Sequence, residues 1–470
     1  MSDMPTQESR GASASISGAA SAPSPNDLAE RMIHRRAVEA VIWGVPAVNT
    51  ELMYQAMVRE TKGGWNQIVY WSRLSDWKNQ TLTPNPDAIY VMPFFNTKDG
   101  PMVLEIPPAE GGSITGTVDD CWQTAMEDVG PAGVDQGKGG KYLITPPGYA
   151  EKIPDGYIHL PSDNYQGYAL LRSILKSGSA ADVVQAVAYA RRIRFYPLSA
   201  AANPPAQTFL DASDVVFDAT IPYDLRFFES LDRVVQTEPW LARDRVMIDV
   251  LRTLGIQKAS PFEPDARTAA ILADAAREAR DWLETHYETA FTPPFYEGTQ
   301  WALPASREAL EGLQSNFANP DSYPVDARGL TYTYAFFCPK HGGKGSYYLM
   351  AIRDGGGQPM RGAETYRLHV PPGVPVTQYW SATAYDRRTH ALIRDMAWPS
   401  RSSNTPGLKA SPDGSVDIWF GPKAPAGGEA NWIPTNPKGD FEVLFRFYAP
   451  EPALFQKAWK LPDVERYVVH

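Results

Sequence analysis

Six short apolar segments occur twice along this chain, in the same order, and this repeat constrains the fold more than any other feature. The first copy runs from residue 89 to residue 172, and the second from residue 347 to residue 446. The matched pairs are IYVMPF with YYLMAI, VLEIPP with RLHVPP, SITGTVDD with WSATAYD, GKYLITPPG with GSVDIWFGPK, YIHLP with NWIP, and ALLR with VLFR. Short β-prone runs bounded by Gly and Pro turns predict a β-sandwich or jelly-roll domain for each copy. The alternative is two unrelated β domains with similar turns.

Helical patterns precede and separate the two β regions. One helix is expected from Leu28 to the turn at 44–46, and another from Val48 to Val58. Residues 223–313 repeat their apolar positions with a period near 3.6, which predicts a helical bridge. From Leu330 the residues TYTYAFF predict a strand. The expected fold is therefore mainly β with helices (α+β), with two tandem β-sandwich domains joined by a helical bridge.

The 470 residues divide on this basis into four parts. These are a disordered tail at 1–25, rich in Ser, Ala, Gly and Pro, N-terminal helices with the first sandwich at 26–200, the helical bridge at 201–329, and the second sandwich at 330–470.

Charge and cysteine content exclude several classes of protein. The net charge is −10 and no run of five or six basic residues occurs, so neither nucleic acid nor an anionic membrane surface is an expected partner. No apolar run spans a bilayer, and the N-terminus lacks the pattern of a secretion signal, so a cytoplasmic location is expected. The chain has two cysteines, Cys121 and Cys338, which are too few for a disulfide framework or a Cys-rich zinc site. A single bridge stays open, but two reduced, buried thiols are favoured.

The repeat also pairs charged residues. Asp120 and Arg172 of the first copy recur as Asp386 and Arg446 of the second. An Arg in an apolar strand needs a partner when it is buried. We therefore predict that each of these arginines lies near an acid of its own domain.

Several of these segments resemble a known pair of bacterial domains. TPNPDAIY (from Thr83), GPMVLEIPP, DDCWQTAMEDVG and GKYLITPPGY resemble the domain of unknown function 1254. YRLHVPPGVPVTQYWSATAYD (from Tyr366), PDGSVDIWFGPKAPAGGEANWIPT and LFRFYAPEPALFQKAWKLPDVERY resemble its usual partner, the domain of unknown function 1214. The resemblance covers nearly everything from about Arg36 onward, apart from the helical middle.

This resemblance implies a two-domain β-sandwich protein with helical connections, and it implies no activity and no catalytic residues. Members commonly carry an Asn-Arg-Tyr segment after the Tyr-Asp strand, whereas this chain has HALIRDMAWPS from His390. Many members also begin with a secretion signal, and the pattern of residues 1–27 leads us to expect none here.

The strand that ends at Asp386 carries the first candidate ligand-binding residues. With a period of two, Tyr379, Ser381, Thr383 and Tyr385 share one face, which is rich in hydroxyl groups and rings. Such a face suits a cleft that binds a small polar molecule. The alternatives are a solvated outer face and a face buried against the helical bridge.

Other candidates lie in loops and at strand ends. Asn85 and Asp87 lie in a proline-rich loop, where they can bind a ligand or cap a turn. Asp120 follows Asp119 in an acidic cluster that can act as acid and base or hold a divalent cation. The seven histidines, His369 among them, show no metal-ligand spacing, so a divalent metal has weak support and no cofactor is predicted.

Two classes of function stay open on this basis. The first is a catabolic enzyme, a hydrolase or lyase, that acts on a small polar or sugar-like molecule in a cleft between a β face and the helical bridge. Its predicted catalytic residues are Asp87, Asp120, His369 and Tyr385, with Asn85 and the hydroxyl face binding the ligand. The second is a non-catalytic ligand-binding or assembly protein, and a homo-oligomer is compatible with both. The two differ in whether the titratable candidates share one cavity.

Overall fold

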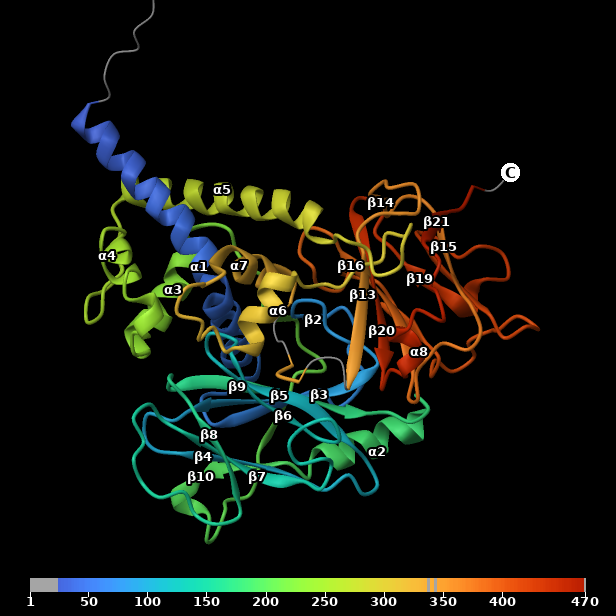
Figure 1. The fold of residues 1–470 in the computed structure, drawn as a ribbon, viewed down its shortest axis with the longest axis horizontal. Helices are drawn as coiled ribbons and strands as arrows, with labels where there is room; N and C mark the ends of the chain where they lie inside the picture. The colour runs from blue at the N-terminus through green and yellow to red at the C-terminus, as the bar shows by residue number, and fades with distance from the viewer. Residues whose placement is uncertain (1–23, 336–338, 342–344, 469–470) are drawn as a thin grey trace, which may run out of the picture.

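The computed structural model describes residues 24–335, 339–341 and 345–468. Within them the chain forms two β-sandwiches and a helical layer that joins them (Figure 1), which confirms the expected α+β fold. The predicted disordered tail, apart from its last two residues, and the predicted thiol of Cys338 lie outside the described residues. Cys121 is a free, buried thiol.

The first sandwich packs a six-stranded sheet on a four-stranded sheet. The larger sheet runs in the order β11 (Phe209–Asp211), β1 (Gln67–Tyr70), β3 (Ala88–Asn96), β9 (Gln166–Ile174), β5 (Ile114–Asp120), β6 (Ala125–Val129). The smaller runs in the order β10 (Arg194–Pro197), β4 (Met102–Ile106), β7 (Gly140–Thr145), β8 (Tyr157–Pro161). Alternate side chains such as Val91, Val118 and Ile144 fill the space between the sheets, which α2 (Ala180–Ala190) closes on one side.

The second sandwich has the same construction. Its larger sheet runs in the order β13 (Ser346–Ala351), β20 (Asp440–Tyr448), β16 (Trp380–Asp386), β17 (Ser400–Ser402), with β14 (Met360–Arg361) also pairing with β20. Its smaller sheet runs in the order β19 (Trp432–Pro434), β18 (Val416–Gly421), β15 (Tyr366–Val370), β21 (Val464–Arg466). The core between the sheets includes Trp380 and Phe445, whose rings stack with centroids 5.5 Å apart, and Leu454 of α8 (Pro452–Phe455).

The two sandwiches share a common set of strands, although β11 and β1 of the first and β14 of the second have no counterpart. β9 lies between β3 and β5, just as β20 lies between β13 and β16. β7 is antiparallel to β4 and parallel to β8, and β18 has the same relation to β15 and β19. Arg172 stands opposite Tyr90 in the first sandwich, and Arg446 stands opposite Tyr348 in the second. The six sequence matches therefore fall on equivalent strands, in equivalent register.

The helical layer consists of α1 (Pro25–Thr61), α3 (Leu225–Thr237), α4 (Met247–Arg252), α5 (Ala266–Ala290), α6 (Arg307–Gln314) and α7 (Val325–Tyr334). Short 3-10 turns lie at Leu198–Ala200, Ala242–Asp244 and Glu429–Asn431, and a small parallel pair is formed by β2 (Asn79–Gln80) and β12 (Phe217–Asp218). Ser24 caps α1 with a capping box, because its hydroxyl accepts the N–H of Asp27 at 3.2 Å and the Asp27 carboxylate accepts the N–H of Ser24 at 3.0 Å.

The predicted break near Pro46 is wrong, because α1 runs through it as one helix. A proline inside a helix leaves the carbonyl four residues earlier without its usual N–H donor, here that of Ile42. Helix α7 comes close at this point, since a Cβ on Gly329 would lie only 2.5 Å from the Ile42 carbonyl oxygen. Tertiary packing of the fully buried middle of α1 thus outweighs the local preference for a break.

A second correction concerns the strand expected from Leu330. The residues TYTY belong to α7, which ends at Tyr334. Leu330 and Tyr332 pack into the core of the helical layer, so burial outweighs the strand propensity of alternating Tyr and Thr. Across the part of the chain that the structure describes, no helix is both long and apolar enough to cross a membrane.

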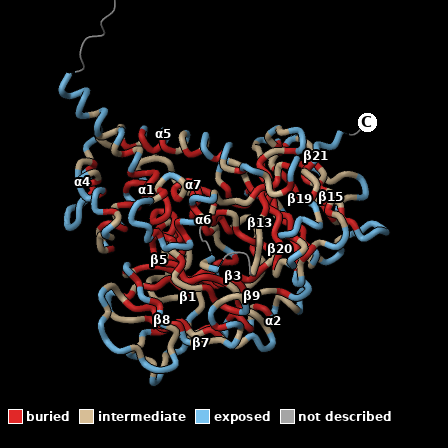
Figure 2. Tube along the Cα trace, in the orientation of Figure 1, coloured by how far each residue is buried: buried red, intermediate tan, exposed pale blue. Residues whose placement is uncertain are grey.

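The helical layer covers the outer faces of both larger sheets. Met53 and Met57 of α1 pack on Met92 and Leu170 of the first sandwich. Leu444 of the second sandwich joins the core of the helices. Buried residues therefore continue from one part to the next, as Figure 2 shows. The equivalent residues Arg172 and Arg446 both lie on these covered faces, where the three parts meet.

Candidate functional site

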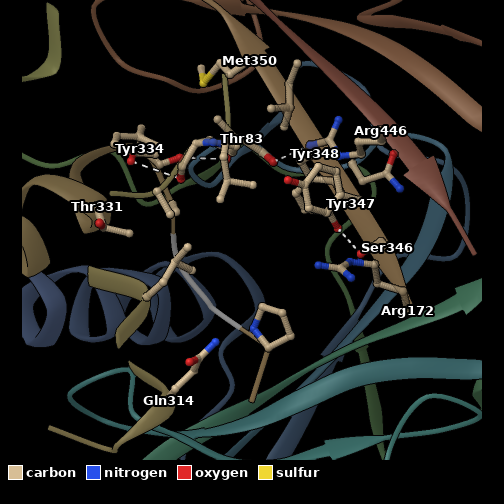
Figure 3. A pocket seen from close by; sticks show the side chains of 18 of the residues that line it. Thr83, Arg172, Gln314, Thr331, Tyr334, Ser346, Tyr347, Tyr348, Met350 and Arg446 are labelled. Carbon is tan, nitrogen blue, oxygen red and sulfur yellow. Dashed lines mark hydrogen bonds between the residues drawn. The ribbon is translucent and has the colours of Figure 1, made fainter. Parts of the chain in front are cut away.

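A cavity of about 540 Å³ lies where the two sandwiches and the helical layer meet. Its wall is built from β3 and β9 of the first sandwich, from β13 and β20 of the second, from α6 and α7, and from the loops at 83–85 and 303–305. Most of the wall is apolar, with Leu303, Met350, Leu444 and Phe455 among its residues. Its charged side chains, among the described residues, are Arg172 and Arg446 (Figure 3). The cavity is therefore positive although the chain as a whole is acidic.

Arg446 reaches this position from the middle of β20 and is only 2% exposed. One guanidinium nitrogen donates to the Thr383 hydroxyl at 3.0 Å. The other donates to the Thr83 carbonyl at 2.9 Å and to the Tyr385 hydroxyl at 2.6 Å. The prediction that an acid of its own domain lies near Arg446 is wrong for the described residues, because hydroxyl and carbonyl oxygens bind the guanidinium and the acid on which its charge acts is Asp87 of the first sandwich.

Arg172 occupies the equivalent position on β9 and is 3% exposed. Its guanidinium carbon lies 5.7 Å from the ring centre of Tyr90, as that of Arg446 lies 5.3 Å from the ring centre of Tyr348. Each sandwich thus contributes one Arg–Tyr cross-strand pair to the same cavity. Because the two larger sheets present these pairs toward one space, the repeat produces a site with two cations.

The loop at 83–87 attaches the first sandwich to the hydroxyl face of β16. The Asn85 amide donates to the hydroxyls of Tyr379 and Tyr448, at 3.0 and 2.7 Å. The Tyr385 hydroxyl donates to the Pro84 carbonyl at 2.6 Å. Asn85 lines the cavity, whereas the loop covers the strand face behind it.

The predicted ligand-binding face of β16 is therefore buried rather than open. Tyr379, Ser381, Thr383 and Tyr385 are all fully buried, and none of them lines the cavity. The face supports Arg446, which Thr383 and Tyr385 hold by hydrogen bonds. Of the solvated face and the buried face considered above, the buried face is the one that occurs. The face is covered by the loop at 83–87 of the first domain, and at Tyr385 also by the helices.

Asp87, a predicted catalytic residue, lies at the far end of the same loop. Its carboxylate accepts from the Ser400 hydroxyl at 2.6 Å. Burial raises the pKa of Asp87, while hydrogen bonds from Ser400 and Ser402 and the charges of Arg446 and Arg401 oppose this rise. Asp87 does not line the cavity. Its hydrogen bond to Ser400 instead joins the loop of the first sandwich to β17 of the second.

Asp120 lies apart from this group, at the end of β5. Its carboxylate accepts the N–H groups of Trp122 and Thr124, at 2.9 and 2.8 Å, and so closes the turn after the strand. Asp386 does the same after β16, where it accepts the N–H of Arg388 at 2.9 Å. The repeated acid is thus a turn residue in both halves. Burial raises the pKa of Asp120, although Arg243 and Arg328 of the helical layer oppose the rise.

Its neighbour Asp119 is fully buried, and neither carboxylate oxygen has a hydrogen-bond partner among the described residues. Burial, with the nearby charges of Asp120 and Asp128, raises the pKa of Asp119 well above its usual range. These surroundings favour the neutral form of the Asp119 carboxyl group over the charged form.

Replacing Asp119 with Asn should therefore stabilise the protein at pH 7 by about 1.4 kcal/mol or more, because Asn does not ionise in the unfolded state and each pKa unit corresponds to about 1.4 kcal/mol. Because the folded-state pKa is raised, the stability of the wild type falls as pH rises from the unfolded value of about 3.9 toward the folded value. The gain from the substitution should then grow with pH. Urea unfolding at pH 5 and pH 7.5 measures it, with Asp163→Asn, at an exposed site in the same sandwich, as the control. Equal effects of the two substitutions would contradict the prediction.

His369 lies farther away, on β15 of the smaller second sheet. Its Nδ1 lies 2.8 Å from a carboxylate oxygen of Asp417 on the neighbouring strand, and its side chain is 42% exposed. The four predicted catalytic residues therefore do not share a cavity: Asp87 and Tyr385 lie behind the site, and Asp120 and His369 lie elsewhere. Within the residues that the structure describes, no three His, Cys, Asp or Glu side chains are grouped to hold a metal.

Of the predicted site residues, Asn85 lines the cavity and the other seven do not, and sequence reasoning missed the two arginines as cavity residues. Arg172 and Arg446 were recognised as a repeated pair, but their convergence was not expected. A second signal was present, because Tyr90-Val91-Met92 and Tyr348-Leu349-Met350 repeat next to them. A charged residue and a ring at matching positions of apolar strands, in both halves, would indicate a shared site.

Comparison with known proteins gives the family context. The sequence matches the protein of unknown function DUF1254 at residues 65–197 and the protein of unknown function DUF1214 at residues 345–452, which confirms the resemblance. The crystal structure of the VPA0106 protein from Vibrio parahaemolyticus is similar, with a TM-score of 0.57 and 16% identity over 93% of this chain and 100% of that one. An uncharacterised protein from Burkholderia cenocepacia gives a TM-score of 0.43 and 12% identity, over 94% and 96%. No curated protein matches the chain.

Proposed function

This chain is a protein with a DUF1254 domain followed by a DUF1214 domain, and we propose that the cavity between the two domains binds a small organic anion with an apolar body. The observation that carries the proposal is the pair of buried arginines, Arg172 and Arg446, in a wall that contains no described carboxylate. Hydroxyl and carbonyl dipoles offset only part of the charge of a buried guanidinium such as that of Arg446, and a bound anion would offset the rest.

The chemistry of the two arginines favours a carboxylate as the anionic group. A guanidinium presents a planar set of donors that matches the two oxygens of a carboxylate. Around them, Leu303, Met350 and Phe455 offer an apolar surface to the rest of the ligand. A sugar-like ligand fits this wall less well, because its many hydroxyls would need polar partners that the wall supplies at few places.

Benzoate is a suitable first probe, because it joins one carboxylate to a flat apolar ring. We expect benzoate to bind and to raise the melting temperature, whereas benzamide, with the same shape and no charge, binds far more weakly. Replacing Arg172 with Met should weaken benzoate binding by about 30-fold or more, since loss of a charge partner from a buried pair costs about 2–5 kcal/mol. Isothermal titration calorimetry measures both ligands.

Two further variants guard against an effect of misfolding. Ala305→Trp places a large ring in the cavity wall and should also abolish benzoate binding without removing a charge. Arg252→Met removes an exposed arginine of α4 and should leave binding unchanged. Equal affinity for benzoate and benzamide, or no binding of either, would refute the proposal.

A further inference from the structure

Tyr348 has the polar surroundings of a phenolate. Its hydroxyl oxygen accepts a hydrogen bond from the Ser346 hydroxyl at 3.0 Å, seen as a dashed line in Figure 3. Tyr448 is a second hydrogen-bond partner, and Tyr448 in turn accepts from the Asn85 amide at 2.7 Å. A phenol oxygen that accepts a hydrogen bond is better suited to the deprotonated form than one without a donor.

Charges around Tyr348 act in the same direction. The guanidinium carbon of Arg446 lies 5.3 Å from its ring centre, and Arg172 approaches from the other sandwich. Burial alone would raise the pKa of Tyr348, but the two arginines and the two hydrogen bonds outweigh burial, so the pKa lies below its usual value. Among the described residues, Tyr379 and Tyr448 also interact with Tyr348, and burial raises the pKa of both.

Tyr348 also stands where a ligand would lie. It lines the cavity together with both arginines, and Figure 3 shows the three side chains gathered on one side of the space. We propose that Tyr348 is the general base of the cavity, and that it removes a proton from the carbon next to a carbonyl group of the bound anion. This inference rests on the proposed anion site and names the reaction carried out there.

The step balances within the site. The C–H bond of the ligand breaks and its proton forms the O–H bond of Tyr348, while the C–H electron pair becomes the C=C bond of an enolate. The negative charge moves to the carbonyl oxygen, next to Arg172 and Arg446, which stabilise it. If the Tyr348 hydroxyl exchanges its proton with solvent before a proton returns to the carbon, the result is hydrogen exchange at that carbon. Departure of a group from the neighbouring carbon, with its bonding pair, completes an elimination of the lyase type.

Phenylpyruvate is the probe for this step, because it carries a carboxylate, an apolar ring and an acidic C–H next to a ketone. In D₂O the wild type should exchange that hydrogen for deuterium faster than buffer does, as followed by NMR. Tyr348→Phe should slow the enzyme-dependent exchange by about 100-fold or more, the usual effect of a general base. Benzoate should still bind to the variant with an affinity within a few-fold of wild type, because the arginines remain.

A pH titration of phenolate absorbance gives a readout that does not depend on turnover. The wild type should show one tyrosine ionisation below the ordinary pKa of about 10, and Tyr348→Phe should lack it. Tyr196→Phe is the matched control, since Tyr196 bonds to Glu105 in the smaller first sheet and burial raises its pKa.

The outcomes separate this inference from the proposed function. If benzoate fails to bind the wild type, the anion site itself is refuted. If benzoate binds, but exchange in the wild type does not exceed that in Tyr348→Phe, the role of Tyr348 is refuted and the anion site stands. Loss of the low ionisation in Tyr348→Phe, together with loss of exchange and retained benzoate binding, supports the inference.

Discussion

Replacing Glu442 with Gln is expected to lower the free energy of unfolding by about 3 kcal/mol or more, as is usual when one partner of a buried ion pair is removed. Glu442 of β20 is fully buried. One carboxylate oxygen lies 2.8 Å from Nδ1 of His390, and the other accepts from the Tyr287 hydroxyl of α5 at 2.7 Å. Arg387 and Glu284 complete a network that fastens α5 to the second sandwich.

The same network predicts how stability depends on pH. Burial alone would lower the pKa of His390, but Glu442 and Glu284 outweigh burial and the opposing Arg387, and raise it to about 9. The unfolded-state value is about 6.5, so protonated His390 contributes its full stabilisation below pH 6.5. This stabilisation is lost as pH rises through about 9. A rise of this size corresponds to about 3 kcal/mol, which agrees with the cost expected for the substitution.

Chemical denaturation at a series of pH values between 6 and 9.5 tests both statements. The wild type should lose stability across this range, and Glu442→Gln should start lower and show a weaker dependence on pH. Glu465→Gln makes the same change at an exposed residue of the second sandwich, and its effect should stay within about 0.5 kcal/mol. A Glu442→Gln variant with the stability and pH dependence of wild type would contradict the role of the network.

The architecture of this protein could be predicted largely from sequence, because strands of period two and their turns are local features. The repeat of VLEIPP as RLHVPP, and of ALLR as VLFR, placed equivalent strands in both halves without any knowledge of tertiary contacts. Local rules failed where tertiary packing decides the outcome. Pro46 lies within a continuous helix, and TYTY is helical, because both segments are buried among other helices.

The site was harder to predict, because it depends on how the two sandwiches face each other. Period two correctly grouped Tyr379, Ser381, Thr383 and Tyr385 on one face, but no local pattern indicates that a loop of the other domain covers that face. Arg172 and Arg446 are 274 residues apart in sequence, and they meet only because equivalent sheets pack with equivalent faces inward. Titratable residues that stood out in sequence, such as Asp120, instead close turns.

The loop at 83–87 joins the two sandwiches next to Arg446. Replacing Asn85 with Ala is expected to weaken the contact between this loop and the second sandwich. The Asn85 side chain makes three hydrogen bonds, to the hydroxyls of Tyr379 and Tyr448 and from the N–H of Asp87. Loss of three such bonds should lower the free energy of unfolding by about 3 kcal/mol, at about 1 kcal/mol each. Because the tyrosines belong to the second sandwich, part of this loss falls on the contact between the domains.

Asn431→Ala is a closely matched control. Asn431 is also buried and also makes three hydrogen bonds, but to backbone groups of Lys409 and Asp417 within the second sandwich. We expect both variants to lose similar stability. Hydrogen exchange should distinguish them, because Asn85→Ala should speed exchange of the Thr83 N–H, which donates to the His390 carbonyl across the domains.

The two variants should also differ in ligand binding. Asn85→Ala should weaken benzoate binding, since Asn85 lines the cavity and its loop supplies the Thr83 and Pro84 carbonyls that hold Arg446. Asn431→Ala should bind benzoate as wild type does, because its hydrogen bonds lie away from the cavity. If both variants lose stability equally and neither changes exchange at Thr83 or benzoate affinity, the loop does not couple the two domains to the site. If only Asn85→Ala changes them, the site depends on docking of the two halves of the repeat.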